Sequence, residues 1–306
     1  MASPAPGGVT NAPALAALAL LLNAFTWGVS WWPFRQLQSL GVHPLWATTL
    51  VYAVALAWLL AVRPLAWRGF VQHPGLWILL IASGLTNIGF NWAVTVGDVV
   101  RVVLLFYLMP AWVVVLAWPL LGEKPTVASL LRLVLALVGV VIVLKTPEVA
   151  WPWPDSLADG LALMGGFCFA LTNIMLRRLQ RAPSHSSMLA MFGGGAVMAG
   201  FAALLGQQQG FVGALPAVDA GWLAWVGGLS LCFLVGNLGL QYGAARLSAS
   251  ATSIIMLSEV VFASTSAVLL GAGELSGRIV LGGALIVLAA LLSTVSWGSG
   301  TAAPAG

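Results

Sequence analysis

Apolar residues occur in ten long runs along the chain, and short polar segments separate them. The runs lie at 13–33, 45–62, 75–96, 99–121, 127–145, 158–179, 186–206, 219–243, 248–271 and 275–297. Each is close to the ~20 residues that an α-helix needs to cross a ~30 Å hydrocarbon core. Turn signals such as Arg63-Pro64 and His73-Pro74 separate neighbouring runs. The pattern predicts an all-α membrane protein with ten transmembrane helices.

The composition supports this prediction. The chain is 60% hydrophobic and 7% charged, with a mean hydropathy of +1.01, whereas soluble domains carry about 25% charged residues. The twelve Lys and Arg residues are scattered singly or in pairs, so the net charge of +4 makes no basic stripe of the kind that binds nucleic acid. We therefore expect a lipid bilayer and a small-molecule substrate as partners, no nucleic acid, and a monomer or weak homo-oligomer.

The distribution of basic residues predicts an orientation in the membrane. An even number of spans puts both termini on one side. The loops and span ends on that side hold eight Lys and Arg residues, against four on the other. Cytoplasmic loops are enriched in positive charge, so we expect both termini in the cytoplasm. No positively charged segment precedes the first apolar run, which argues against a cleaved signal peptide.

The chain divides into two similar halves. A shift of 150 residues superposes Asn87 on Asn237 and Gly89 on Gly239, and a shift of 142 lays Arg35 on Arg177. We expect a disordered tail at 1–12, a first five-helix repeat at 13–145, a linker at 146–157, a second repeat at 158–297 and a disordered tail at 298–306. Because five is odd, the second repeat enters the bilayer from the opposite side. Such inverted repeats are typical of secondary transporters, which bind substrate near the midplane.

Two segments resemble a known family. The segment GAARLSASATSIIMLSEVVFA, followed by LLGAGE and LGGALIVLAALL, resembles the EamA unit of the drug/metabolite transporter superfamily, and LLFYLMPAWVVVLAWPLLGEKP resembles the same unit in the first half. The chain departs from the family pattern at Val260, where proline is usual, and at Arg132, near a usual glycine. The resemblance implies an exporter in a bacterial-type inner (plasma) membrane. Members handle amino acids, cationic drugs and other solutes, and the aromatic amino acid exporters are the most similar in length and aromatic content.

Amide and hydroxyl side chains form polar stripes on two of the predicted helices. Ser83, Asn87 and Asn91 share one face of the third span, and Asn237 and Gln241 share a face of the eighth. Hydrocarbon offers no hydrogen-bond partners, so these faces must turn toward the bundle or a wet cavity. They could bind the polar part of a substrate. They could equally hydrogen-bond neighbouring helices and hold the bundle together.

Glu259 is a lone carboxylate about ten residues into the ninth span, ~15 Å deep at ~1.5 Å per residue. An ionised carboxylate is costly near the bilayer centre, so the group must be protonated, paired or in contact with water. It is a candidate proton site or a partner for a substrate amine. The alternative is a structural acid that hydrogen-bonds a neighbouring helix.

Aromatic and polar residues at other spans complete the set of candidate substrate contacts. Trp27 on the first span, Asn173 on the sixth, Tyr107 on the fourth and Tyr242 on the eighth could stack on an aromatic substrate or attract a cation. Packing is the alternative role for each. Pro110 lies within the fourth span, where a proline kinks a helix, and is a candidate hinge.

Two other function classes find little support in the sequence. His43, His73 and His185 all fall in predicted loops, and neither GxSxG nor HExxH occurs, so we expect no enzyme, catalytic residue or metal site. A channel would need a symmetric oligomer or a continuous polar lining. No phosphate-binding loop occurs and no cofactor is expected, so transport would follow a solute gradient or proton movement through alternating access.

Overall fold

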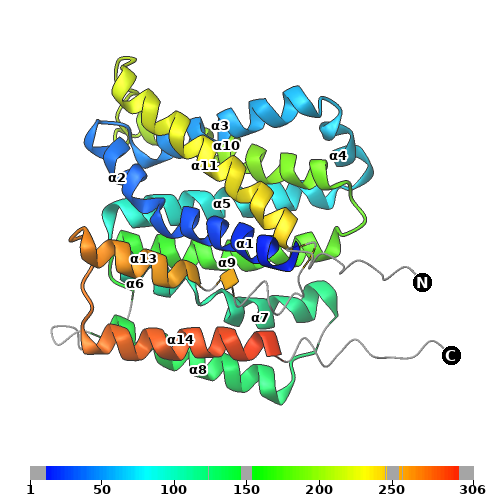
Figure 1. Ribbon diagram of the computed structural model, residues 1–306, viewed down its shortest axis with the longest axis vertical. Coiled ribbons are helices and arrows are strands. Elements are labelled where there is room, and N and C mark those ends of the chain that lie inside the picture. Colours follow the sequence, from blue (N-terminus) through cyan, green and yellow to red (C-terminus); the bar gives the residue numbers. More distant parts are fainter. Residues whose placement is uncertain are drawn as a thin grey trace, which may run out of the picture.

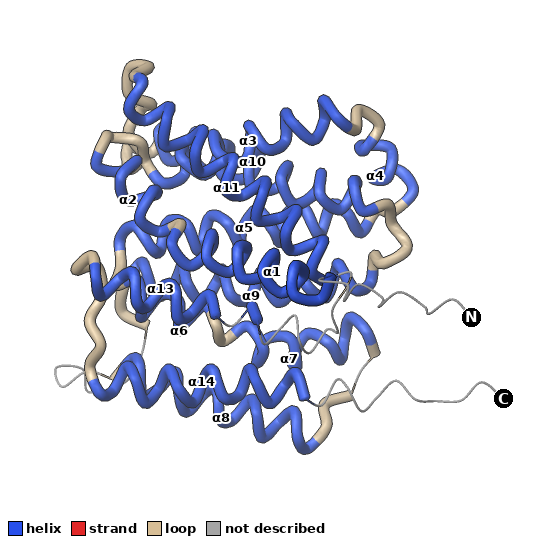
Figure 2. The backbone as a smooth tube through the Cα atoms, viewed as in Figure 1, coloured by secondary structure: helices blue, strands red, loops and turns tan. Residues whose placement is uncertain are grey.

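The regular structure of the chain is helical throughout its described part. The computed structural model describes residues 12–122, 124–145, 154–244, 246, 255–256 and 258–295. Within these residues Figure 2 shows helices and loops but no strand. The predicted tails, apart from Ala12, and residues 146–153 of the predicted linker lie outside the described residues.

The first half contains eight α-helices and one short 3₁₀ helix. They are α1 (Ala12–Val29), α2 (Trp31–Ser39), α3 (Pro44–Val62), η1 (Ala66–Arg68), α4 (Gly69–Gln72), α5 (Gly75–Val96), α6 (Val99–Phe106), α7 (Met109–Leu121) and α8 (Val127–Leu144). The described helices of the second half are α9 (Leu157–Arg178), α10 (Ser184–Gln208), α11 (Ala220–Ala244), α13 (Ser258–Leu269) and α14 (Gly277–Val295).

The described helices are suited to a membrane in length and in surface. Seven segments are long and apolar enough to cross a bilayer, and three shorter apolar helices lie in α8, α13 and α14. Large apolar side chains are exposed on the outside of the molecule, as at Leu131, Phe201 and Leu281. Such a surface fits hydrocarbon rather than water. The prediction of a multi-span helical membrane protein is thus supported, while the count of ten spans stays a prediction.

Two predicted spans are interrupted helices. The first run, predicted to end at 33, continues as α2 to Ser39, and the chain bends at Ser30, whose hydroxyl donates to the Trp27 carbonyl at 2.8 Å. The fourth run breaks between Phe106 and Met109, so it forms α6 and α7 rather than one kinked helix. Apolar composition continues through both interruptions, which is why the hydropathy pattern does not reveal them.

Several helix contacts are those expected if the two halves are equivalent copies. Helix α1 of the first half packs on α11 and α13 of the second half. Helix α9 of the second half packs on α5, α6 and α7 of the first half. Helices α3 and α8 pack on the helices at the matching places in the second half. Helix α3 packs on α10 near one edge of the bundle, and α8 packs on α14 near the other (Figure 1).

One pair of glycines shows this equivalence at the level of single residues. A Cβ atom added to Gly89 of α5 would lie 2.6 Å from the Leu161 carbonyl oxygen of α9. A Cβ atom added to Gly239 of α11 would lie 2.7 Å from the Ala19 carbonyl oxygen of α1. The shift of 150 relates the two glycines, and the shift of 142 relates Ala19 to Leu161. Both contacts require glycine because the helix backbones approach too closely for a side chain.

The bundle has two distinct ends along its helix axes. We call the end where α1 begins and α14 ends the termini end. The far end is the one where α5 ends and α6 begins, at the left of Figure 1, and there α13 also ends and α14 begins.

Candidate functional site

Tyr107 and Glu259, two of the residues singled out from the sequence, meet in the structure. Tyr107 follows the last residue of α6, in the break before α7, and Glu259 lies in the first turn of α13. The Tyr107 hydroxyl donates a hydrogen bond to Oε2 of Glu259 at 3.0 Å. Tyr107 is buried and Glu259 is partly exposed. A carboxylate thus faces a phenol across the boundary between the two halves.

Aromatic rings surround the Tyr107 side of this contact. The Phe106 ring packs against those of Phe90, Phe169 and Tyr107, with centroids 4.9, 5.4 and 6.2 Å away. Phe90, Phe106 and Phe169 come from α5, α6 and α9, and all four rings belong to the largest buried cluster of the described residues or pack on it. Trp27 joins from α1, with its ring stacked on Phe233 at 4.6 Å and edge-on to Phe90 at 6.4 Å. The carboxylate therefore lies beside an aromatic region, a combination that suits a cation or an aromatic amine.

Four side chains carry buried polar atoms without a hydrogen-bond partner among the described residues. These atoms are both amide atoms of Asn23, the amide oxygen of Asn91, the indole nitrogen of Trp112 and the hydroxyl of Thr172. Trp112 lies one turn beyond Tyr107 along the chain, and its ring meets Phe167 edge-on at 5.5 Å. A buried donor without an acceptor costs about 1–3 kcal/mol. A ligand or water that reached Trp112 would recover part of this free energy.

The polar stripe of α5 is engaged with neighbouring helices. The Asn87 amide oxygen accepts from the Tyr52 hydroxyl at 2.6 Å, and its amide nitrogen donates to the Ser83 carbonyl at 2.9 Å. Asn91 donates to the Thr48 hydroxyl at 3.1 Å. All of these side chains are buried between α3, α5 and α10. This geometry matches the interhelical alternative raised by the sequence, and substrate contact by Ser83, Asn87 and Asn91 stays a prediction.

We expect Tyr52→Phe to reduce stability without changing transport. The substitution removes the donor that satisfies the Asn87 amide oxygen in a buried position. Hydrogen bonds between membrane helices contribute about 1 kcal/mol, and the thermal midpoint in detergent should fall accordingly. Thr86→Val is the matched control, because the Thr86 hydroxyl bonds only to a carbonyl of its own helix. A loss of transport per folded molecule in Tyr52→Phe would contradict this structural role.

The other predicted site residues differ in burial and in contacts. Asn173 is exposed and donates to the Phe169 carbonyl at 2.9 Å. Asn237 is partly buried, and the Gln241 side chain lies outside the described residues. The Arg246 guanidinium lies 3.7 Å from the centre of the Tyr242 ring.

Pro110 lies in the first turn of α7, where a missing amide proton costs no helical hydrogen bond. Its role as a hinge stays a prediction.

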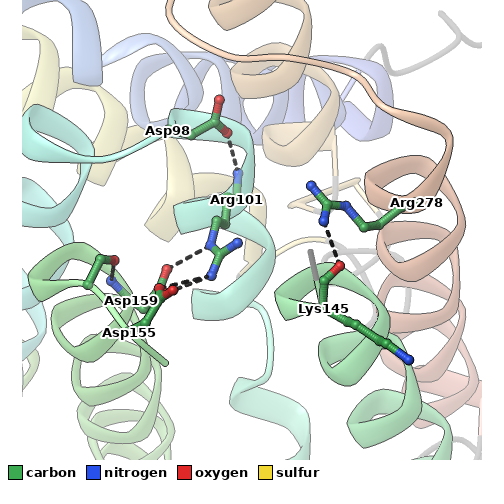
Figure 3. Close-up of polar contacts among 7 residues, drawn as sticks. Asp98, Arg101, Lys145, Asp155, Asp159 and Arg278 are labelled. Carbon is green, nitrogen blue, oxygen red and sulfur yellow. Dashed lines mark hydrogen bonds and ion pairs between the residues drawn. The ribbon is translucent and has the colours of Figure 1, made fainter. Parts of the chain in front are cut away.

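A charged cluster at the far end was not singled out from the sequence. The Arg101 guanidinium donates from Nε and Nη2 to the two carboxylate oxygens of Asp159, at 2.8 and 2.7 Å, and Asp155 lies 3.7 Å from Nη2 (Figure 3). In the sequence, Arg101 is a loop charge that reports orientation, and Asp155 and Asp159 are polar residues of the linker and the next helix. The pairing depends on the packing of α6 on α9, so no local signal predicts it.

Comparisons with known proteins give a family and a fold. The family model described as "EamA-like transporter family" matches residues 14–145 and again 156–295. A solved structure described only as "Crystal structure of protein" is 18% identical to the chain, with a TM-score of 0.56, and the match covers 92% of this chain and 96% of that one. At this identity the likeness shows the fold alone. No curated protein matches the chain significantly.

Proposed function

We propose that this chain transports amino acids. The premise is that the chain belongs to the EamA-like transporter family and is a membrane transporter of small solutes. Aromatic amino acids, together with other neutral ones, would leave the cell across the inner membrane by secondary transport. Family membership also argues against the enzyme alternative, because the activity of the family is transport.

The observation that carries the proposal is the contact between Tyr107 and Glu259. The Tyr107 hydroxyl donates to Oε2 of Glu259, and in this proposal the other carboxylate oxygen, Oε1, pairs with the ammonium group of an amino acid. The rings of Phe106 and Phe169 lie beside Tyr107 and provide an apolar surface for an aromatic side chain. The unpartnered indole N–H of Trp112, on α7, is a donor that suits a substrate carboxylate.

The arrangement of the two halves supports alternating access. The paired glycine contacts, Gly89 on Leu161 and Gly239 on Ala19, are those expected of two copies related by an approximate twofold axis. Transporters built in this way expose a central site to each side in turn as one copy rocks against the other. In this scheme Tyr107 and Glu259 belong to opposite copies, and rocking would change the distance between them. The excess of basic residues on the termini side supports cytoplasmic termini.

An exporter of cationic drugs is the second candidate function. A carboxylate next to aromatic rings also suits a permanent cation, because both groups attract positive charge without requiring a substrate carboxylate. The two candidates differ at Trp112, whose indole N–H favours a substrate with an acceptor.

Uptake into proteoliposomes separates the two candidates. The purified chain should accumulate labelled phenylalanine and tryptophan saturably, in competition with other neutral amino acids, and the measurement is made with and without a pH gradient. A labelled quaternary ammonium compound should compete weakly, because it lacks the carboxylate. Saturable uptake of the cation, with no uptake of any amino acid, would replace the first candidate by the second. Uptake of neither solute would overturn both.

A further inference from the structure

We propose that the ion pair between Arg101 and Asp159 is a latch that holds the far end of the transport path closed. The latch rests on the proposed transport function, since it controls access to the same path. It joins α6 of the first half to α9 of the second. A transport path between the halves can open at the far end only if α6 and α9 separate there, and this separation breaks the ion pair.

The geometry of the pair makes it stronger than an ordinary surface contact. Nε of Arg101 donates to Oδ1 of Asp159 and Nη2 donates to Oδ2. The Asp159 side chain is 2% exposed and that of Arg101 is 18% exposed. Bidentate pairs of this type combine charge with fixed orientation. Each partner is also held by its own helix start. The Asp98 carboxylate accepts from the Arg101 backbone N–H at 2.8 Å, and the Ser156 hydroxyl accepts from that of Asp159 at 3.1 Å.

Further polar contacts between the halves lie at the same end. The second carboxylate oxygen of Asp98 accepts from the Glu274 backbone N–H at 3.1 Å, so the turn between α13 and α14 is tied to the start of α6. The Arg278 guanidinium donates to the Lys145 carbonyl at 2.5 Å, between α14 and the end of α8 (Figure 3). The far end is therefore fastened by contacts on α6, α8, α9 and the α13–α14 turn, and in this proposal the structure corresponds to the conformation closed at that end.

Two features allow the ion pair between Arg101 and Asp159 to break during transport. The pair lies at the edge of the bundle, where Asp155 is 57% exposed, so water can solvate both ions once they separate. The short helix α6 also connects the latch to the substrate site. Arg101 lies near its start and Tyr107 directly after its end, about 9 Å further at ~1.5 Å per residue. A tilt of α6 that breaks the ion pair therefore also moves the Tyr107 hydroxyl relative to Glu259.

The test is the accessibility of a cysteine buried at the far end, beside the start of α6. Ala267 of α13 is fully buried, and its Cβ atom lies near Gly273, which also adjoins the Asp98 carboxylate. Ala267→Cys is made in the full chain with Cys168→Ala and Cys232→Ala, and a membrane-impermeant maleimide is added from the side away from the termini. With the latch intact, labelling should be slow. Asp159→Asn should accelerate it about tenfold, the equivalent of ~1.4 kcal/mol in the closing equilibrium.

Matched variants separate the latch from general damage to the fold. Asp155→Asn removes the exposed partner and should leave the labelling rate unchanged. Arg101→Lys keeps the charge but loses the bidentate geometry, so an intermediate rate is expected. The exchanged pair, Arg101→Asp with Asp159→Arg, should restore slow labelling. Equal rates in the parent and in folded Asp159→Asn, or equal acceleration in Asp155→Asn, would overturn the latch.

The labelling rates need no substrate, so they test the latch independently of the amino acid proposal. A faster rate in Asp159→Asn would support the latch even if no amino acid were transported. Unchanged rates in a protein that transports phenylalanine would overturn the latch and leave the proposed function intact.

Discussion

Glu259→Gln is expected to reduce transport of an amino acid about 10- to 100-fold, because a hydrogen bond between charged groups contributes about 1.5–3 kcal/mol. The substitution keeps the shape of the side chain and its acceptor for the Tyr107 hydroxyl, but it removes the negative charge that would pair with the substrate ammonium. Expression and the thermal midpoint should change little. The measurement is initial uptake of labelled phenylalanine per folded molecule in proteoliposomes.

Tyr107→Phe is the companion variant. It leaves the carboxylate in place and removes only the neighbouring hydroxyl, so a smaller loss than in Glu259→Gln is expected. The order of the two effects therefore reports which group meets the substrate. Full transport per folded molecule in Glu259→Gln would show that the acid is structural, which is the alternative that the sequence left open.

Gly89→Ala and Gly239→Ala are expected to destabilise the fold, each by about 1–3 kcal/mol, which is the usual cost of forcing extra atoms into a packed interface. In each variant the new methyl group would lie within 2.7 Å of a carbonyl oxygen on the facing helix, where only a backbone shift gives relief. The measurement is the thermal midpoint in detergent, together with the yield of folded protein.

Gly160→Ala on α9 and Gly227→Ala on α11 are matched controls, since a Cβ atom at either position meets nothing within 4 Å. Alanine favours a helix over glycine by about 0.5–1 kcal/mol, so these variants should be neutral or slightly stabilising. If the two halves are equivalent copies, Gly89→Ala and Gly239→Ala should lose similar amounts of stability, and the control variants should lose none. A loss at only one of the two glycines would contradict the equivalence.

The sequence predicts the longer helices well because hydropathy decides where they lie. The predicted run 75–96 coincides with α5, and the run 127–145 differs from α8 by one residue. Apolar length and flanking turn residues are local properties, and the bilayer imposes them on each segment separately. The breaks after Val29 and Phe106 leave the apolar runs uninterrupted, so hydropathy alone does not mark them.

Side-chain partners are the part that the sequence could not supply. The pattern singled out Tyr107 and Glu259 as candidate site residues, but it could not predict their contact, which joins positions 152 residues apart. Asn87 was predicted to share a polar face with Asn91, which leaves open whether that face meets a cavity or a helix. The Tyr52 hydroxyl on α3 occupies the Asn87 acceptor, a result that depends on which face of α5 turns toward α3.

Pro110 illustrates how one residue type can serve two local structures. A proline inside an apolar run predicts a kink, because it removes a hydrogen bond from a continuous helix. In the structure the helix has already ended at Phe106, and a new one begins at Met109. The proline then initiates α7 instead of bending it, and the break leaves Tyr107 outside regular helix, facing Glu259.

The central claim is that solute passes between the two halves, beside Tyr107 and Glu259, and that this region opens to each side in turn. Its most direct test is a cysteine at Phe169, which packs on Phe106, in the chain with Cys168→Ala and Cys232→Ala. An impermeant maleimide is added to proteoliposomes from either side separately. The account predicts labelling from both sides, slowed in each case by saturating phenylalanine. Labelling from one side only would contradict it. So would labelling rates that no transported solute changes.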